Sequence, residues 1–369
     1  MATNKWMSQL TKDFGAVADS LPEPTDKIIP LVSPSLNWAI GNGGLIEGKA
    51  ICFFGAESGG KSLLMQLTLI QIQKQDPEAI CVLFDAEYAF NKAWFRKLGG
   101  DLTRLIVRQT NDPIKIFDYI YGEMNEAVQE GAPIRAIAID SVKSIKYPKD
   151  NKKQSTDLTM GGGGASYLGS ALKHVTPVIR ENNITCILVQ QVYEEMDQYK
   201  KMRNPYLVPD GRALKHFCDY MVQVDKLETK DGIVEEGENM IGGAAQVGHK
   251  VRCRFKKNRC GAPYRTAQFT LNYDAGIVDT SNELFDLGKS LGIIYHPISA
   301  TTGKENVQMW QVGTHEPIRG EDNMRLFVTS NPRVQDEILA ACLAADDKQV
   351  AARNAQMDMA NVEIDPDDL

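Results

Sequence analysis

The chain of 369 residues has a formal net charge of −7, with 43% hydrophobic and 24% charged residues, a composition typical of soluble globular proteins. It contains no run of about 18 apolar residues, and its first residues lack the apolar core of a signal peptide, so neither a membrane span nor secretion is expected. Seven cysteines without a C-x-x-C pair predict free thiols in a reducing cytoplasm, with Cys52, Cys81 and Cys186 in the core.

An amphipathic helix is predicted near the N-terminus, over residues 5–20. Prolines at positions 22 and 24 follow it, so we expect the helix to be tethered to the core by a short linker. Its apolar stripe must be buried on its own domain or on a neighbouring molecule. The stripe consists of Met7, Leu10, Phe14, Val17 and Ala18.

The next segment predicts a site for a nucleoside triphosphate. Residues 51–54 form an apolar strand, residues 55–62 fit the pattern G-x-x-x-x-G-K-[ST], and residues 63–73 continue as a helix. In this arrangement backbone N–H groups surround phosphate oxygens, a lysine reaches the β- and γ-phosphates, and a hydroxyl binds Mg²⁺. The predicted nucleotide-binding residues are Gly55, Ala56, Glu57, Ser58, Gly59, Gly60, Lys61, Ser62 and Leu63.

Strands and helices then alternate, which predicts an α/β fold with a mainly parallel sheet covered on both faces. Strands are expected at 80–84, 105–107, 134–139 and 185–189, and helices at 92–98, 113–129 and 165–180. Beyond residue 219 the segments 220–224, 249–255 and 264–273 alternate in the manner of antiparallel strands. Residues 280–345 are expected to form a small mixed region, and the polar tail ends with four carboxylates between residues 363 and 368.

Two predicted strands end in carboxylates. Asp140 follows an apolar strand and is expected to hold Mg²⁺ together with Ser62, directly or through water. Asp85 and Glu87 follow the strand at 80–84. Glu87 could orient the water that attacks the γ-phosphate, or the two acids could simply cap a helix. Spacing alone does not decide between these interpretations.

The motifs in this order resemble those of RecA-type recombinases. The resemblance rests on residues 55–62, on Asp85-Ala-Glu87, on Asp140-Ser141, and on Lys257-Asn-Arg259 followed by Gly261-Ala-Pro263. The segment 191–201 is further similar to the UvsX-like recombinases of T4-type bacteriophages. The resemblance covers roughly residues 30–295. It implies a RecA-like phosphate-loop ATPase core at 29–280, with an N-terminal helical polymerisation arm at 1–28. A small C-terminal region at 281–345 and an acidic flexible tail at 346–369 would follow.

The resemblance also assigns roles to single residues. It makes Glu87 the catalytic glutamate and Gln191 the glutamine that senses the γ-phosphate and signals to DNA, with a solvated amide at a strand end as the alternative for Gln191. Trp94 stands where the family places an aromatic ring against adenine, but it could equally be a core residue. Asn91 replaces an acidic residue common near the adenine, and both Asn91 and Trp94 are counted among the nucleotide-binding residues. Lys257 and Arg259 would reach the ATP of a neighbouring protomer, whereas the pattern alone favours a solvated basic face.

Two loops should contact DNA by the same resemblance, at about 143–164 and 192–211. Flexible glycines and lysines suit a phosphate backbone, and basic residues interleaved with tyrosines suit single strands. Disordered lysine-rich surface loops are the alternative, and three carboxylates at 194, 195 and 197 make the second loop less basic. The predicted DNA-binding residues are Lys146, Lys152, Lys153, Gly161, Gly162, Gly163, Gly164, Lys200, Lys201, Arg203 and Arg212.

Taken together, the resemblance implies an ATP-dependent DNA strand-exchange protein that uses ATP and Mg²⁺. Its partners would be single-stranded DNA, homologous duplex DNA and further copies of itself in a helical filament, with a single-strand-binding protein and a loading mediator as additional candidates. It would act in the cytoplasm, that of the host cell if a phage encodes it. Two alternatives remain open: a hexameric helicase built on the same core, and a mediator subunit that binds ATP and DNA without hydrolysis.

Overall fold

The computed structural model describes residues 27–146, 163–194, 206–208, 211–227, 232–238, 244–299 and 303–345. The predicted N-terminal helix at 5–20 and the acidic tail at 346–369 lie outside the described residues. All seven cysteines are free, and Cys52, Cys81 and Cys186 are buried as predicted. Among the described helices, none is long and apolar enough to cross a membrane.

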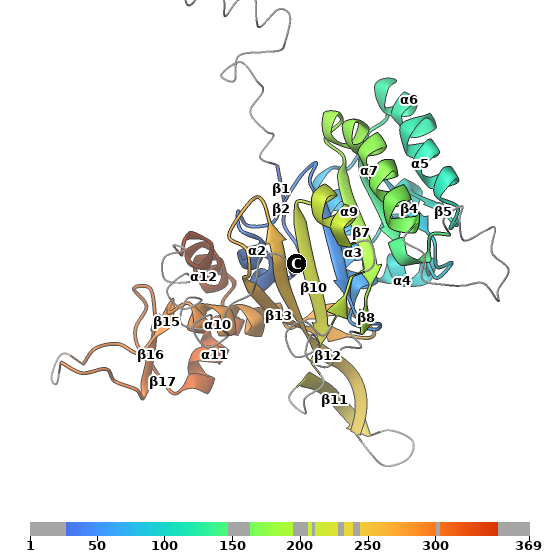
Figure 1. The fold of residues 1–369 in the computed structure, drawn as a ribbon. Helices are drawn as coiled ribbons and strands as arrows, with labels where there is room; N and C mark the ends of the chain where they lie inside the picture. The colour runs from blue at the N-terminus through green and yellow to red at the C-terminus, as the bar shows by residue number, and fades with distance from the viewer. Residues whose placement is uncertain are drawn as a thin grey trace, which may run out of the picture.

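A large twisted sheet organises the described residues (Figure 1). Its strand order is β14-β13-β12-β10-β3-β7-β6-β4-β5, and β11 pairs with β12. The strands from β10 to β5 run parallel, whereas β11 to β14 are antiparallel, so the predicted mainly parallel sheet is confirmed. The strands are β3 (Ala50–Gly55), β4 (Ile80–Asp85), β5 (Leu105–Arg108), β6 (Ile134–Asp140), β7 (Thr185–Gln191), β10 (Tyr220–Lys226), β11 (Ile233–Glu238), β12 (Ala244–Asn258), β13 (Thr266–Asn272) and β14 (Gly276–Val278).

Helices cover both faces of the sheet, because successive side chains of a strand point to opposite faces. In β3, Ile51 and Phe53 belong to one hydrophobic core, and Cys52 and Phe54 belong to the other. The first core includes α2 (Pro34–Ile40), α3 (Lys61–Gln75) and α4 (Lys92–Lys97), and the second includes α5 (Pro113–Tyr121), α6 (Glu123–Gln129), α7 (Gly163–Glu181) and α9 (Gly211–Phe217). Short elements join them: β1 (Ile28–Ile29), β2 (Leu45–Ile46), η2 (Leu102–Arg104), η3 (Val142–Ser144), and the pair β8 (Tyr193–Glu194) and β9 (Tyr206–Leu207).

Two sequence-based expectations were wrong in detail. The helix predicted at 113–129 is divided into α5 and α6, because Gly122 has a non-helical backbone (φ −93°, ψ −98°). The segment at 220–224 was expected to be antiparallel, yet β10 pairs in parallel with β3 and antiparallel only with β12. Six of its seven residues are buried, so this strand lacks the alternation that a half-exposed strand would show.

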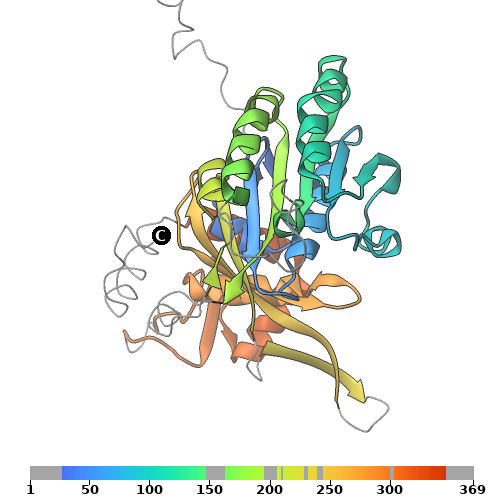
Figure 2. The ribbon, with the colours of Figure 1, turned by 45° about the vertical axis from the view of Figure 1, so that its right-hand side comes forward.

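The C-terminal region follows the last strand of the sheet and lies to one side of it (Figure 2). In the same view β11 and the first part of β12 project beyond the sheet. The region contains a three-stranded sheet in the order β15-β16-β17, packed with helices. Its elements are α10 (Thr280–Ser290), β15 (Ile294–Tyr295), β16 (Met309–Val312), β17 (Ile318–Arg319), α11 (Glu321–Ser330) and α12 (Pro332–Ala344).

A buried glutamate joins this region to the sheet domain. Glu283 of α10 accepts hydrogen bonds from the Ser33 hydroxyl and, at 2.7 Å, from the Ser35 N–H at the start of α2. Burial raises the pKa of Glu283 to about 7, although the hydrogen bonds from the two serines oppose this shift. Its second oxygen, Oε2, is buried without a partner among the described residues. A proton on that oxygen would remove the cost of a buried charge.

The raised pKa predicts that stability depends on pH. Between the usual value of 4.5 and about 7, the folded protein holds a proton that the unfolded chain has released, so the free energy of unfolding falls as pH rises. Glu283→Gln stays neutral and should remove up to about 1.4 kcal/mol of this loss per pH unit. Thermal unfolding between pH 5 and 7.5 measures it. The exposed Glu130→Gln is the control, and an equal pH slope in Glu283→Gln and the wild type would contradict the prediction.

Candidate functional site

The nucleotide motif lies at the carboxyl end of β3, in the strand–loop–helix setting that the sequence predicts. Gly55 needs to be glycine because a Cβ there would lie 2.2 Å from the Val224 carbonyl oxygen of the neighbouring strand β10. Gly60 has a left-handed backbone (φ 95°) and immediately precedes α3, which begins at Lys61. The N-terminus of a 15-residue helix therefore faces the loop, and its free N–H groups favour an anion.

Lys61 is a buried cation beside two acids. Its ammonium donates a hydrogen bond to the Ala56 carbonyl of the same loop. Burial lowers the pKa of Lys61, while the nearby carboxylates of Asp140 and Glu87 oppose that shift. A buried lysine at this position provides a positive charge with little hydration, which suits phosphate binding.

Asp140 ends β6 and lies close enough to accept a hydrogen bond from the Ser62 hydroxyl. Burial raises the pKa of Asp140 to about 6, and the negative charges of Glu87 and Asp85 act in the same direction. Its Oδ1 atom is buried and has no partner within the described ranges. A hydroxyl and an unpaired carboxylate oxygen next to a phosphate-binding loop are ligands that Mg²⁺ accepts, so these residues fit the predicted metal.

The two acids after β4 have different surroundings. Asp85 is buried, and its carboxylate accepts hydrogen bonds from the N–H groups of Ala89 and Phe90 and from the side chain of Gln109. Glu87 is exposed, and its Oε1 accepts from the Ser141 hydroxyl. The capping interpretation therefore describes Asp85, and Glu87 is left facing the end of β6.

Gln191 ends β7, next to β3 and β6. Its Nε2 donates to Glu87 Oε1 at 2.9 Å, and its Oε1 accepts from Lys143 Nζ at 3.2 Å. The plain interpretation of a solvated amide is thus incomplete, because the amide bridges an acid and a base. The structure brings Lys61, Asp140, Glu87 and Gln191 together, as the sequence led us to expect.

A cleft of about 410 Å³ opens beside the loop. Trp94 lines it and also packs against the hydrophobic core, so the two interpretations of this residue are compatible. A second wall comes from β12, β13 and the residue after β13, and sequence reasoning missed it. Its residues are His249, Leu271, Asn272 and Tyr273, and the other lining residues are Ser58, Gly60, Lys61, Ser62 and Leu63.

The missed wall carries polar groups that could contact a nucleotide. His249 Nδ1 lies 3.3 Å from the Tyr273 hydroxyl, and Nε2 is buried with no partner in the described part of the chain. Burial lowers the pKa of His249, and the positive charge of Lys226 adds to the effect. In the sequence, a histidine inside an apolar strand pattern was the one signal that could have indicated this part of the cleft. The Asn91 side chain caps α4 by accepting from the Trp94 N–H at 3.0 Å, and its place near the adenine stays a prediction.

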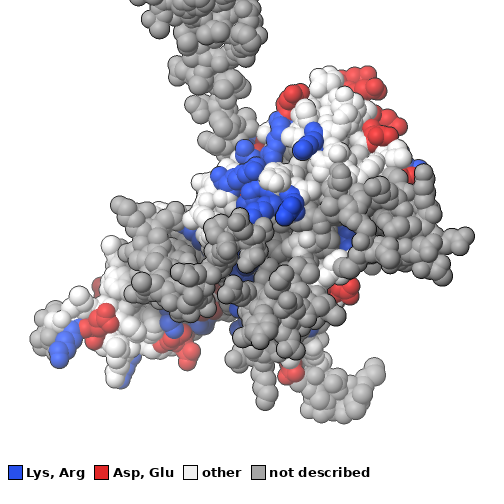
Figure 3. Space-filling model, viewed as in Figure 1, with Lys and Arg blue, Asp and Glu red and all other residues white. Residues whose placement is uncertain are grey.

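Lys257 and Arg259 lie far from this cleft, at the amino end of β3. Strand β10 pairs Tyr220 with Ile51 on one side and with Asn258 on the other. The Lys257 ammonium donates to the carbonyls of Lys215 and Cys218 at the C-terminal end of α9. Figure 3 shows Lys and Arg side chains gathered over α9.

Asp219 holds this corner together. It accepts from the Ala50 N–H at 2.8 Å, pairs with Arg180 at 2.7 Å, and lies 3.8 Å from Arg259. The same carboxylate thus connects the start of β3 to α7 and to the end of β12.

Most predicted DNA-binding residues lie outside the described residues. This holds for Lys152, Lys153, Gly161, Gly162, Lys200, Lys201 and Arg203. Lys146 and Arg212 are described, and both are exposed. The prediction that Gly163 and Gly164 belong to a DNA-binding loop places them wrongly, because they form the first turn of α7.

Comparison with known proteins agrees with this geometry. The family model for the RecA N-terminal domain matches residues 2–278, ending with the last strand of the large sheet. Protein RecA of Allorhizobium ampelinum is 27% identical over 341 residues, 91% of this chain and 86% of that protein. Protein RecA of Thermus aquaticus is 26% identical over 351 residues, 94% of each chain. Protein RecA of Aquifex aeolicus is 27% identical over 340 residues, 90% of this chain and 89% of that protein.

Proposed function

The chain belongs to the RecA family, and we propose that it is a DNA-dependent ATPase that exchanges DNA strands within helical filaments. The observation that carries this proposal is the meeting of a phosphate-binding loop, Asp140, Glu87 and Gln191 at one edge of the sheet. ATP would hold the filament on single-stranded DNA, and hydrolysis to ADP and phosphate would loosen it. Homology would be read by base pairing, because phosphate and stacking contacts carry no sequence information.

The residues of the site divide the work of hydrolysis. Lys61 and the start of α3 would bind the phosphates, and Ser62 with Asp140 would hold Mg²⁺, which neutralises charge on the phosphate oxygens when bound. Glu87 would orient the attacking water and accept its proton, because it is an exposed carboxylate held in place by hydrogen bonds from Ser141, Ser144 and Gln191. Trp94 and the wall of β12 and β13 would enclose the nucleoside.

Lys257 and Arg259 would act on the ATP of a neighbouring protomer. The support is the strand register. Residue 51, at the start of β3, is four residues from residue 55, where the phosphate-binding loop begins, and this separation is roughly 13 Å along a strand. Since Asn258 lies level with the start of β3, the two basic residues cannot reach the loop that follows its other end. The guanidinium of Arg259 can grip phosphate oxygens with two parallel hydrogen bonds.

We place the chain, more finely, in the UvsX-like branch found in T4-type phages, acting in the host-cell cytoplasm. The support is the sequence of residues 191–201 together with identities of only 26–28% to bacterial relatives. Residues 1–28 would be the polymerisation arm, and the acidic tail would compete with DNA for basic surface. A single-strand-binding protein and a loading mediator are proposed as further partners.

The test of the proposed function is ATP hydrolysis with and without single-stranded DNA, alongside pairing of a labelled strand with homologous duplex. The wild type should show both activities. Glu87→Gln should slow turnover by about 100-fold and still bind a fluorescent ATP analogue, because only the group that positions water is lost. Lys61→Ala should instead weaken nucleotide binding. Near-normal hydrolysis by Glu87→Gln would contradict the assignment.

Mixing two inactive variants tests the action between protomers. Neither Glu87→Gln nor the double variant Lys257→Ala/Arg259→Ala should hydrolyse ATP at the DNA-stimulated rate alone. Their mixture should regain part of it, because some interfaces then pair an intact Glu87 with intact basic residues. Lys256→Ala, next to Lys257 on β12, is the matched control and should be active alone. No rescue at any ratio, in filaments shown to be mixed, would mean that the basic residues act elsewhere.

A further inference from the structure

A lysine at the end of β6 connects the nucleotide site to the segment that follows β7. Lys143 lies in η3, and its Nζ is 3.2 Å from Gln191 Oε1 and 4.4 Å from the centre of the Tyr193 ring. The side chain is half-buried. Burial is the main cause of the lowered pKa of Lys61, and the positive charge of Lys143 acts in the same direction, so its field extends to the phosphate-binding loop.

The contacts of Lys143 determine how Gln191 is oriented. The amide nitrogen of Gln191 faces the carboxylate of Glu87, and the amide oxygen faces the ammonium of Lys143. A turned amide would place its N–H group against the ammonium and its oxygen against the carboxylate, which are two repulsive contacts. Lys143 therefore keeps the donor end of Gln191 directed at the catalytic carboxylate.

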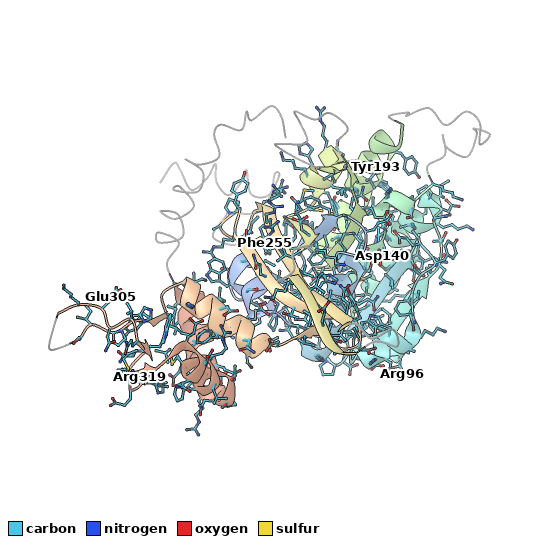
Figure 4. All side chains as sticks on the ribbon, turned by 90° about the horizontal axis from the view of Figure 1, so that it is seen from below. Arg96, Asp140, Tyr193, Phe255, Glu305 and Arg319 are labelled. Carbon is cyan, nitrogen blue, oxygen red and sulfur yellow. The ribbon has the colours of Figure 1, made fainter. Side chains whose placement is uncertain are left out.

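Tyr193 connects the same lysine to the base of a strand pair. It begins β8 two residues after the end of β7 and pairs with Leu207 of β9. Its ring is 52% exposed, and the ammonium of Lys143 is attracted to the ring face. Figure 4 shows Asp140 within the sheet domain and Tyr193 on its rim, both well away from Glu305 and Arg319 of the C-terminal region.

We propose that Lys143 is a positioning residue that couples the nucleotide site to β8 and β9 through Gln191 and Tyr193. The inference rests on the proposed function. A γ-phosphate next to Lys61 attracts the Lys143 ammonium and the Gln191 amide, so Lys143 leaves the face of Tyr193 and β8 is released. With a diphosphate the contacts to Gln191 and Tyr193 persist. The protein thus has two arrangements, one with Lys143 on the face of Tyr193 and one with Lys143 turned toward the phosphates. The nucleotide shifts the equilibrium between them because a triphosphate and a diphosphate favour different arrangements.

The experiment measures the affinity for a fluorescein-labelled oligo-dT strand, by anisotropy, with a non-hydrolysable ATP analogue and with ADP. The ratio of the two affinities reports the coupling. Lys143→Ala should lower this ratio by about five-fold or more, and Lys143→Arg should restore most of it, because arginine keeps the charge and the ring contact. Lys146→Ala is the matched control. This exposed lysine three residues away should lower both affinities equally and leave the ratio unchanged.

Tyr193→Leu completes the design. It should lower the affinity ratio as Lys143→Ala does. The double variant should lower the ratio no further than either single variant, since both substitutions remove the same contact between Lys143 and Tyr193. Losses that multiply in the double variant would overturn the proposal, as would equal weakening of both affinities by Lys143→Ala. If the wild-type protein binds DNA with the same affinity in the presence of the ATP analogue and of ADP, the proposed function is wrong, and so is this inference.

Discussion

The hydrogen-bond register of the parallel strands is the constraint on which the site depends. Gly55 is paired with Gln191 across β3 and β7, and Asp85 is paired with Asp140 across β4 and β6. All four residues end their strands, so the parallel arrangement brings them to one edge although they lie up to 136 positions apart. A slip of one residue in any pair would turn its side chains to the other face and separate the groups.

The same edge shows how burial assigns different tasks to chemically similar groups. Asp85 is buried and uses its carboxylate to hold the turn after β4, so it is not available to a substrate. Asp140 is buried with one oxygen unpaired, which suits a cation. Glu87 remains exposed, where a carboxylate can exchange a proton with water. The sequence Asp-Ala-Glu cannot distinguish these roles, because they depend on contacts with β5 and β6.

Local patterns predicted the elements well, whereas long-range pairing set the remaining features. The loop at 55–62 and the flanking strand and helix follow from glycine placement and apolar runs. His249 and Tyr273 could not be placed, because they reach the cleft only through the pairing of β12 and β13 with a sheet begun some 200 residues earlier. The parallel pairing of β10 depends likewise on β3, and the bend at Gly122 depends on one backbone angle.

Under the proposed function, the polarity of the sheet explains why ATP hydrolysis would depend on an assembly. The phosphate-binding loop follows the carboxyl end of β3, and Lys257 and Arg259 lie at its amino end, where Asp219 fixes the corner. Groups at opposite edges of one sheet cannot meet within one molecule. They meet when one copy presents its amino edge to the carboxyl edge of the next, which is a head-to-tail contact. Such contacts extend into helical filaments unless the rotation closes a ring. The proposed division of the catalytic groups between the two ends of the sheet therefore calls for a neighbouring molecule.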